Sequence, residues 1–124
     1  MKNMKEDFKK VGIDVEISRM EWAAFLDKMS KKEFDATNLV WGMPFESDPY
    51  QLWHSSQADK DGSSNYISYK NPEVDRLLEM ARTEFDKDKR NGFYRRFHEL
   101  LHDEQPYTFM YATPKLYAIS KRFD

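Results

Sequence analysis

The chain has 124 residues, of which 40% are hydrophobic and 34% charged, a composition typical of ordinary globular domains. Its 20 basic and 22 acidic residues are interspersed and give a formal net charge of -2, so no basic block indicates a nucleic-acid partner. The absence of cysteine excludes disulfides, thiolate metal sites and cysteine nucleophiles. This length has room for one core, and we expect residues 1–124 to form a single domain.

The first residues predict the last turns of a helix. Met4, Phe8 and Val11 recur at helical spacing, and Gly12 follows them as a C-terminal cap would. The same stretch alternates charges where a secretory signal would need an apolar run. No stretch of the chain is long and apolar enough to predict a membrane span. The chain is therefore expected to be either a cytosolic protein or an internal piece of a longer secreted chain, and the helix whose start is missing favours the second.

Strand and helix patterns then alternate in chain order. Residues 13–18 alternate apolar and polar side chains and predict a half-buried strand. Residues 21–32 predict a helix, and residues 37–41 a second strand that is more apolar at its end. Residues 42–71 are loop-like, with a short helical turn expected at residues 50–54.

The second half predicts two helices followed by two strands. Asn71 and Pro72 are typical of a helix start, and Asp86 is expected to cap the next helix, which ends at Pro106. The expected buried faces consist of Val74, Leu77, Leu78, Ala81 and Phe85, and of Phe93, Phe97, Leu100 and Leu101. Residues 108–112 and 116–119 predict strands that form a hairpin around residues 114–115. Together these elements predict a mixed α/β (α+β) fold in which a mixed sheet packs with helices.

The loop of about thirty residues is long for a compact domain, and such loops are usually functional or disordered. Its aromatic content argues against disorder, because these side chains need either the core or a ligand to cover them. In α/β sheets, ligands bind beyond the carboxyl ends of strands, which is where this loop begins. The aromatic residues in and next to the loop are Trp41, Phe45, Tyr50, Trp53, Tyr66 and Tyr69.

Several short motifs occur in an order that resembles one known family. They are V-G-I-D-V-E at 11–16, E-W at 21–22, F-D-A at 34–36, D-P-Y at 48–50, N-Y at 65–66, N-P-E-V-D-R-L at 71–77 and Q-P-Y at 105–107. Together they resemble the carboxyl-terminal lobe of the oligopeptide/dipeptide solute-binding proteins of ABC importers. The resemblance covers the chain from about Met4 onward. It implies one lobe of a type II periplasmic-binding-protein-like fold, within a larger two-lobe protein that closes around a peptide or related small solute.

The resemblance also implies which residues face the ligand. Trp41, Gly42 and Met43 match the family's strand end, which hydrogen-bonds the ligand backbone. Peptide-specific members carry an Asp three residues after this Trp, whereas this chain has Pro44. Sugars, opine-like molecules and metal chelates are therefore kept as alternative ligands. Proline carries no charge and has no N–H to donate. The remaining candidate ligand-binding residues are Phe45, Asp48, Trp53, Asn65 and Tyr66.

The implied partners follow from the same family. They are the ligand and, through the full-length protein, the membrane permease of an ABC importer, with no cofactor and no enzymatic activity. The implied location is periplasmic or extracellular, anchored to the membrane. If a first strand is missing from the sheet, the exposed edge would favour dimerisation of the isolated chain.

A second motif points to another class of protein. His98-Glu99-Leu100-Leu101-His102 is an H-E-x-x-H sequence on a predicted helix, in which two histidines could hold zinc and the glutamate could act as a base. The downstream sequence offers no matching third ligand apart from Asp124. We therefore expect no catalytic metal site, and at most adventitious zinc or nickel binding by His98 and His102. A non-catalytic interaction module is the third class left open.

Overall fold

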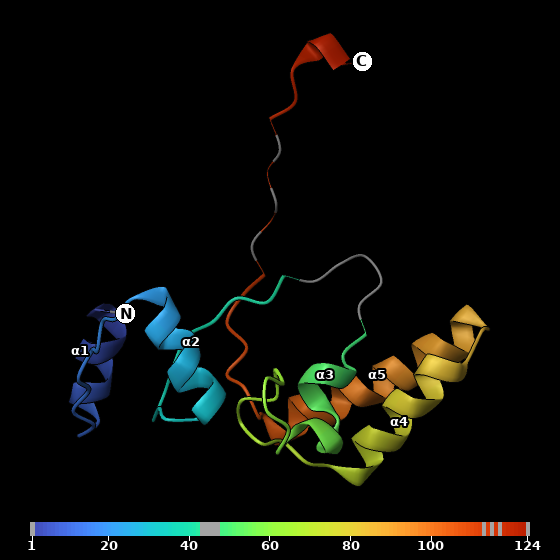
Figure 1. Ribbon diagram of the computed structural model, residues 1–124, viewed down its shortest axis with the longest axis horizontal. Helices are drawn as coiled ribbons and strands as arrows, with labels where there is room; N and C mark the ends of the chain where they lie inside the picture. The colour runs from blue at the N-terminus through green and yellow to red at the C-terminus, as the bar shows by residue number, and fades with distance from the viewer. Residues whose placement is uncertain (1, 43–47, 113, 115, 117, 124) are drawn as a thin grey trace.

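The computed structural model describes residues 2–42, 48–112, 114, 116 and 118–123. Helices dominate these residues, and Figure 1 shows a packed helical region joined to long extended segments. In chain order the elements are α1 (Lys2–Lys10), α2 (Trp22–Lys31), α3 (Tyr50–Trp53), the 3-10 helix η1 (Ser55–Gln57), α4 (Pro72–Thr83), α5 (Lys87–Glu104) and the 3-10 helix η2 (Lys121–Phe123). The predicted helices are therefore present, although their ends differ by a few residues.

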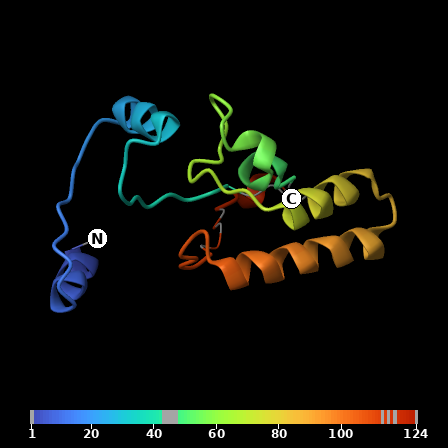
Figure 2. The ribbon, with the colours of Figure 1, turned by 90° about the horizontal axis from the view of Figure 1, so that it is seen from below.

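Helices α4 and α5 form a helical hairpin that is the largest packed unit in Figure 2. The Asn71 side chain accepts hydrogen bonds from the backbone N–H groups of Glu73 and Val74, which satisfies free donors at the start of α4. Asp86 caps α5 in the same way through the N–H of Lys89. Both caps were predicted from the sequence and are confirmed.

The hydrophobic core lies between this hairpin and α3. Its buried members come from three helices and one loop, and partly buried side chains such as Phe93, Tyr94 and Tyr107 pack around them. The core consists of Trp53, Tyr69, Val74, Leu77, Leu78, Phe97 and Leu101. Most of the apolar faces predicted for the two helices are therefore confirmed. Phe85 is an exception, because α4 ends at Thr83 and leaves this ring 97% exposed.

The predicted mixed sheet is wrong for this chain, since none of the described residues forms a strand. Residues 13–18, 37–41 and 108–112 adopt neither helix nor strand, nor do 116, 118 and 119 of the fourth predicted strand. The predicted hairpin turn lies partly outside the described residues. Helices satisfy their own N–H and C=O groups, whereas a strand must pair with a neighbour. Within the described residues, none of these segments pairs with another one as a strand. The alternation of apolar residues alone therefore did not produce a sheet.

Two of the extended segments nevertheless approach each other. The Asn38 side-chain amide lies 3.3 Å from the Met110 sulfur, which brings the segment before Gly42 beside the segment after Gln105. The views in Figures 1 and 2 agree with this approach, and both show α1 and α2 set apart from the helical hairpin. Lys32, which follows α2 in a left-handed conformation (φ 59°), ties this part to the core by donating hydrogen bonds to the Ala58 carbonyl and the Ser68 hydroxyl.

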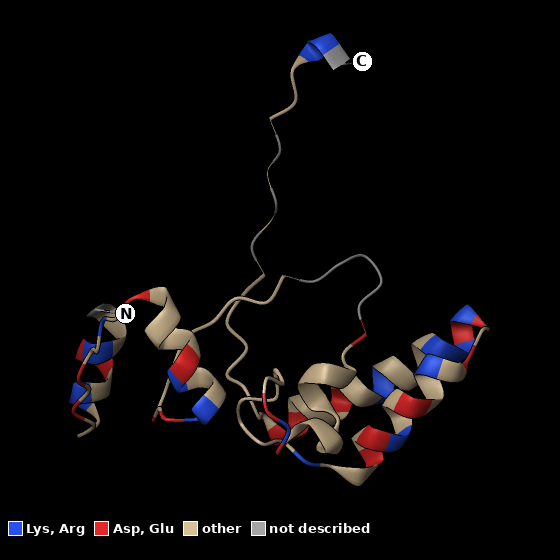
Figure 3. Cartoon of the chain, in the orientation of Figure 1, with Lys and Arg blue, Asp and Glu red and all other residues tan. Residues whose placement is uncertain are grey.

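Charged side chains of both signs are mixed along the helices (Figure 3). Arg96 on α5 illustrates the pattern, because it pairs with Glu73 on α4 at 2.9 Å and with Glu99 at 3.2 Å. None of the helices in the described part of the chain combines the length and the apolar character needed to cross a bilayer.

Candidate ligand-binding site

A group of partly exposed aromatic rings lies where the two extended segments meet the core. Trp41 and Tyr66 stack with ring centroids 6.0 Å apart and planes 13° from parallel. Tyr107 and Phe109 lie beside Trp53, at 4.8 and 6.4 Å between ring centroids. We call Trp41, Tyr66, Tyr107 and Phe109 the aromatic cluster. Trp41 is 37% exposed and Phe109 is 55% exposed, so the cluster offers ring surface to a ligand.

Trp53 fixes this cluster to the core. Its ring is buried, and it contacts Tyr69 edge-on at 5.5 Å between centroids and Phe97 at 6.3 Å. Burial raises the pKa of the Tyr107 hydroxyl further above neutral pH, so this group is an uncharged polar group in the cluster. The cluster thus combines flat apolar faces with a neutral polar group, a combination common in small-molecule sites.

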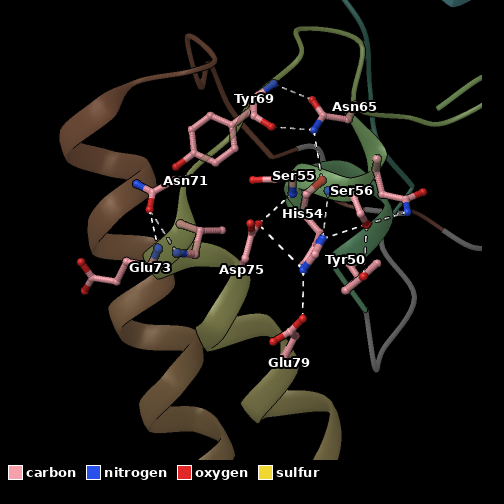
Figure 4. A network of polar contacts seen from close by, with 12 residues as sticks. Tyr50, His54, Ser55, Ser56, Asn65, Tyr69, Asn71, Glu73, Asp75 and Glu79 are labelled. Atoms are coloured by element: carbon pink, nitrogen blue, oxygen red, sulfur yellow. Dashed lines mark hydrogen bonds and ion pairs between the residues drawn. The ribbon is translucent and has the colours of Figure 1, made fainter. Parts of the chain in front are cut away.

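Asn65 organises the loop between η1 and α4 through hydrogen bonds to the Tyr69 backbone (Figure 4). This residue is fully buried, and its amide oxygen accepts from the Tyr69 N–H at 2.8 Å while its amide nitrogen donates to the Tyr69 carbonyl at 2.9 Å. The same nitrogen lies 3.5 Å from the His54 carbonyl. Asn65 therefore shapes the backbone that carries its neighbour Tyr66, and both polar atoms of its amide are engaged by the Tyr69 backbone.

His54 connects the loop to α4, as Figure 4 also shows. Its Nδ1 accepts a hydrogen bond from the Ser56 N–H at 3.1 Å, so the proton of the neutral ring is on Nε2. That Nε2 lies 3.4 Å from a Glu79 carboxylate oxygen and 3.9 Å from an Asp75 oxygen, without a well-formed hydrogen bond within the described residues. The N–H at Nε2 is attracted to these two carboxylates of α4, which indicates a structural role for His54.

Asp48 lies at a shallow surface hollow of about 460 Å³ on the other side of α3. One of its oxygens accepts from the Tyr50 N–H at 3.0 Å, and the other pairs with Arg82 at 3.1 Å. The Arg82 guanidinium lies 4.4 Å from the centre of the Tyr50 ring, and that ring stacks on His54. Both carboxylate oxygens of Asp48 are therefore occupied by partners within the chain.

The structure brings together only some of the residues expected to bind a ligand. Trp41 and Tyr66 share the aromatic cluster, and Gly42 follows Trp41 with open space where a Cβ would be. Trp53 and Asn65 are buried supports, and Asp48 is paired with Arg82. Met43, Pro44 and Phe45 lie outside the described residues.

Tyr107 and Phe109 join the site although sequence reasoning did not select them. The available signal was the Q-P-Y motif at 105–107, which was used only to support the family resemblance. Phe109 lies in the predicted strand 108–112, and Tyr107 lies between the predicted helix and that strand. The approach of both rings to Trp53 depends on how α5 returns the chain to the core.

The H-E-x-x-H residues lie on the outer side of α5. His98 and His102 are exposed, in agreement with the expected phase of the helix, whereas Phe97 and Leu101 face the core. Glu99 is engaged by Arg96. Within residues that the structure describes, no group of three or more His, Cys, Asp or Glu side chains is placed to hold a metal ion.

Comparison with known proteins identifies relatives along most of the chain, although no protein-family model matches it. The oligopeptide-binding protein AppA of Bacillus subtilis is 34% identical over 110 residues, covering 87% of this chain and 20% of AppA. The oligopeptide-binding protein OppA of the same organism is 31% identical over 83% of this chain and 18% of OppA. The chain thus spans about a fifth of the length of these relatives.

Solved structures agree with the sequence comparison. The structure of AppA in complex with a nonapeptide matches 85% of this chain with a TM-score of 0.77 and 36% identity, over 21% of that chain. The ABC transporter-associated periplasmic binding protein DppA of Helicobacter pylori, in complex with the peptide STSA, matches 83% with a TM-score of 0.72 and 27% identity, again over 21% of that chain.

The chain is homologous to a segment of the oligopeptide- and dipeptide-binding proteins and belongs to that solute-binding family. The family resemblance predicted from the ordered motifs is therefore confirmed. The relatives are named as binding proteins and not as enzymes.

Proposed function

We propose that this chain is the part of an ABC-importer solute-binding protein that supplies the aromatic cluster to a peptide-binding cleft. The observation that carries the proposal is the match to AppA, a protein solved with a bound nonapeptide, at 36% identity and a TM-score of 0.77. The exposed stack of Trp41 on Tyr66 gives this match a chemical basis, because aromatic faces bury the apolar surface of a ligand.

The cleft is completed by a second lobe in a longer protein, of which residues 1–124 are one carboxyl-terminal piece. The relatives, which are about five times as long as the matched segment, support this. The full protein would work outside the cytoplasmic membrane, in the periplasm or anchored to the cell surface. It would deliver its ligand to an ABC permease and would carry out no chemical reaction on it.

The ligand is a peptide or a related small solute, held mainly through apolar and backbone contacts. Position 44 is a proline, which cannot pair with a ligand amine, and Asp48 already pairs with Arg82. A free α-amino group should therefore contribute little to affinity. We expect acetylation of the amino terminus of a bound peptide to change the dissociation constant by less than about threefold.

The test is a calorimetric titration of peptides of increasing length into the full-length protein that contains this chain. Trp41→Ala is expected to weaken binding at least tenfold, about 1.4 kcal/mol, because truncated aromatic anchors dominate the loss of binding energy. Trp22→Ala is the matched control, since Trp22 is exposed on α2 and stacks on Phe25. It should leave the affinity unchanged within about twofold.

Two results would overturn the proposal. One is the absence of binding across peptides, sugars and metal chelates in a correctly folded protein. The other is an equal loss of affinity from Trp41→Ala and Trp22→Ala, which would mean that the aromatic cluster has no specific contact with the ligand. Circular dichroism of both variants checks that the helices of the core are intact.

A further inference from the structure

We propose that His98 and His102 form a two-histidine chelating site for a divalent transition metal on the outer face of α5. The two residues are one helical repeat apart on an 18-residue helix with a side-chain cap at its start and a left-handed residue, Gln105, at its end. Residues at i and i+4 have Cβ atoms about 5–6 Å apart. Two imidazoles on such a pair can both reach a metal at about 2 Å, the usual length of a metal–imidazole bond.

The surroundings of the pair leave both rings accessible. His98 and His102 are exposed and line the same shallow hollow of about 540 Å³, together with Arg95, Arg96, Glu99 and Asp103. Within the described residues, no hydrogen bond holds either imidazole ring. The opposite face of the helix, with Phe97 and Leu101, packs in the core, so the backbone under the pair is fixed. A fixed backbone reduces the entropy lost when both rings bind one ion.

The charges around the pair largely balance, and the imidazole nitrogens decide which metal the pair can hold. Arg96 is paired with Glu73 and Glu99, so its charge is largely compensated, whereas Arg95 opposes a cation and Asp103 favours one. A site with two imidazoles suits nickel, copper and zinc better than calcium or magnesium, which prefer oxygen ligands. Water would complete the coordination of the metal.

This site does not make the chain a zinc peptidase. A catalytic zinc needs three protein ligands, and no group of three candidate ligands is found among the described residues. Glu99, which would be the base of an H-E-x-x-H enzyme, forms an ion pair with Arg96. The chelating pair is also independent of the aromatic cluster, so its test stands whether or not the proposed peptide binding is correct.

The test is a calorimetric titration of nickel chloride into the untagged 124-residue chain at about pH 7.5. We expect one nickel ion per chain. His98→Ala and His102→Ala should each weaken binding at least tenfold, because either change removes one of the two ligands. Acidification to about pH 5 should abolish binding, since protons compete with the metal for imidazole nitrogen.

Glu99→Gln is the matched control, because it changes the residue between the histidines and leaves both rings in place. It should keep the dissociation constant within about threefold. The proposal fails if the wild-type chain does not bind nickel. It also fails if the double variant with both histidines changed to alanine still binds as well as the wild type, which would assign the metal to another part of the chain such as His54.

Discussion

The helical region from Tyr50 to Gln105 and the extended segments around it differ in how they satisfy the backbone. In the helices of this region the backbone groups bond to partners within a few residues, and the side chains of α3, α4 and α5 close a core around Trp53. The described residues of the extended segments form no strand ladder, and side chains such as Val40, Tyr111 and Leu116 are exposed. The stability of the chain is therefore expected to come mainly from the helical region, because helices satisfy their own backbone groups and strands need a partner strand.

The site lies at the border between these two regions. The helical region supplies Trp53 as a support, and the extended segments supply Trp41, Tyr107 and Phe109. The proposed ligand site would combine a rigid base with chain segments whose own packing is incomplete. Three of the predictions below compare the same substitution in the two regions, and the fourth tests the link between α2 and the loop of the helical region.

The largest effect is expected from removing core volume. Leu78→Ala should lower the free energy of unfolding by about 2–5 kcal/mol, because the buried side chain leaves a cavity between α4 and α5. Leu116→Ala, the same change at a residue that is 91% exposed, should shift it by less than about 0.5 kcal/mol. Urea unfolding followed by circular dichroism measures both. Equal losses would mean that the extended end is packed in solution.

The second effect concerns the buried amide of Asn65. Asn65→Ala removes both hydrogen bonds to the Tyr69 backbone and leaves that N–H and carbonyl buried without partners. We expect a loss of about 2–3 kcal/mol in the free energy of unfolding. Asn38→Ala should cost less than about 0.5 kcal/mol, since Asn38 is exposed and its side chain makes a weak bond to the Met110 sulfur. A smaller cost at Asn65 than at Asn38 would contradict the structural role of this amide.

The third effect depends on pH. Burial, together with the 2.6 Å hydrogen bond to Glu104, raises the pKa of the Tyr69 hydroxyl above its ordinary value of 10.0. The folded chain therefore keeps this proton when the unfolded chain loses it, so the free energy of unfolding should fall as pH rises above about 10. The slope from one such proton is at most about 1.4 kcal/mol per pH unit.

Tyr69→Phe isolates this contribution. It should cost about 1 kcal/mol at neutral pH and should make the alkaline loss of stability less steep, with Tyr107 supplying what remains. Tyr111→Phe, at an exposed residue in the extended segment, should leave the slope unchanged. Unfolding curves collected between neutral pH and about pH 11 compare the two variants. Identical slopes in both would argue against a buried Tyr69 hydroxyl.

The smallest effect should come from the link between α2 and the core. Lys32→Ala removes the hydrogen bonds to the Ala58 carbonyl and the Ser68 hydroxyl and should cost about 0.5–1 kcal/mol. Lys31→Ala removes only an exposed pair with Asp27 and should cost less. Hydrogen exchange in α2 is the more sensitive measurement, because only the Lys32 variant should release this helix from the loop. Equal exchange in both variants would show that α2 is held in another way.

The sequence by itself determined the helices and the family. Asn71, Pro72 and Asp86 act on backbone groups within three or four residues, so their capping roles could be inferred locally and are confirmed. The apolar spacing of α4 and α5 likewise identified most of the core, because a helix turns its face with a fixed period. The ordered motifs identified the family because many short matches in the correct order are specific together.

Only the tertiary structure decided what the extended segments do and which aromatic residues meet. Alternating apolar residues predict a strand, but a strand forms only where another strand pairs with it, and no local pattern contains that partner. The roles of Trp53 and Asn65 as buried supports, and the addition of Tyr107 and Phe109 to the cluster, arise from contacts between residues far apart in sequence. Such contacts depend on how the chain folds back on itself, which spacing along the chain does not encode.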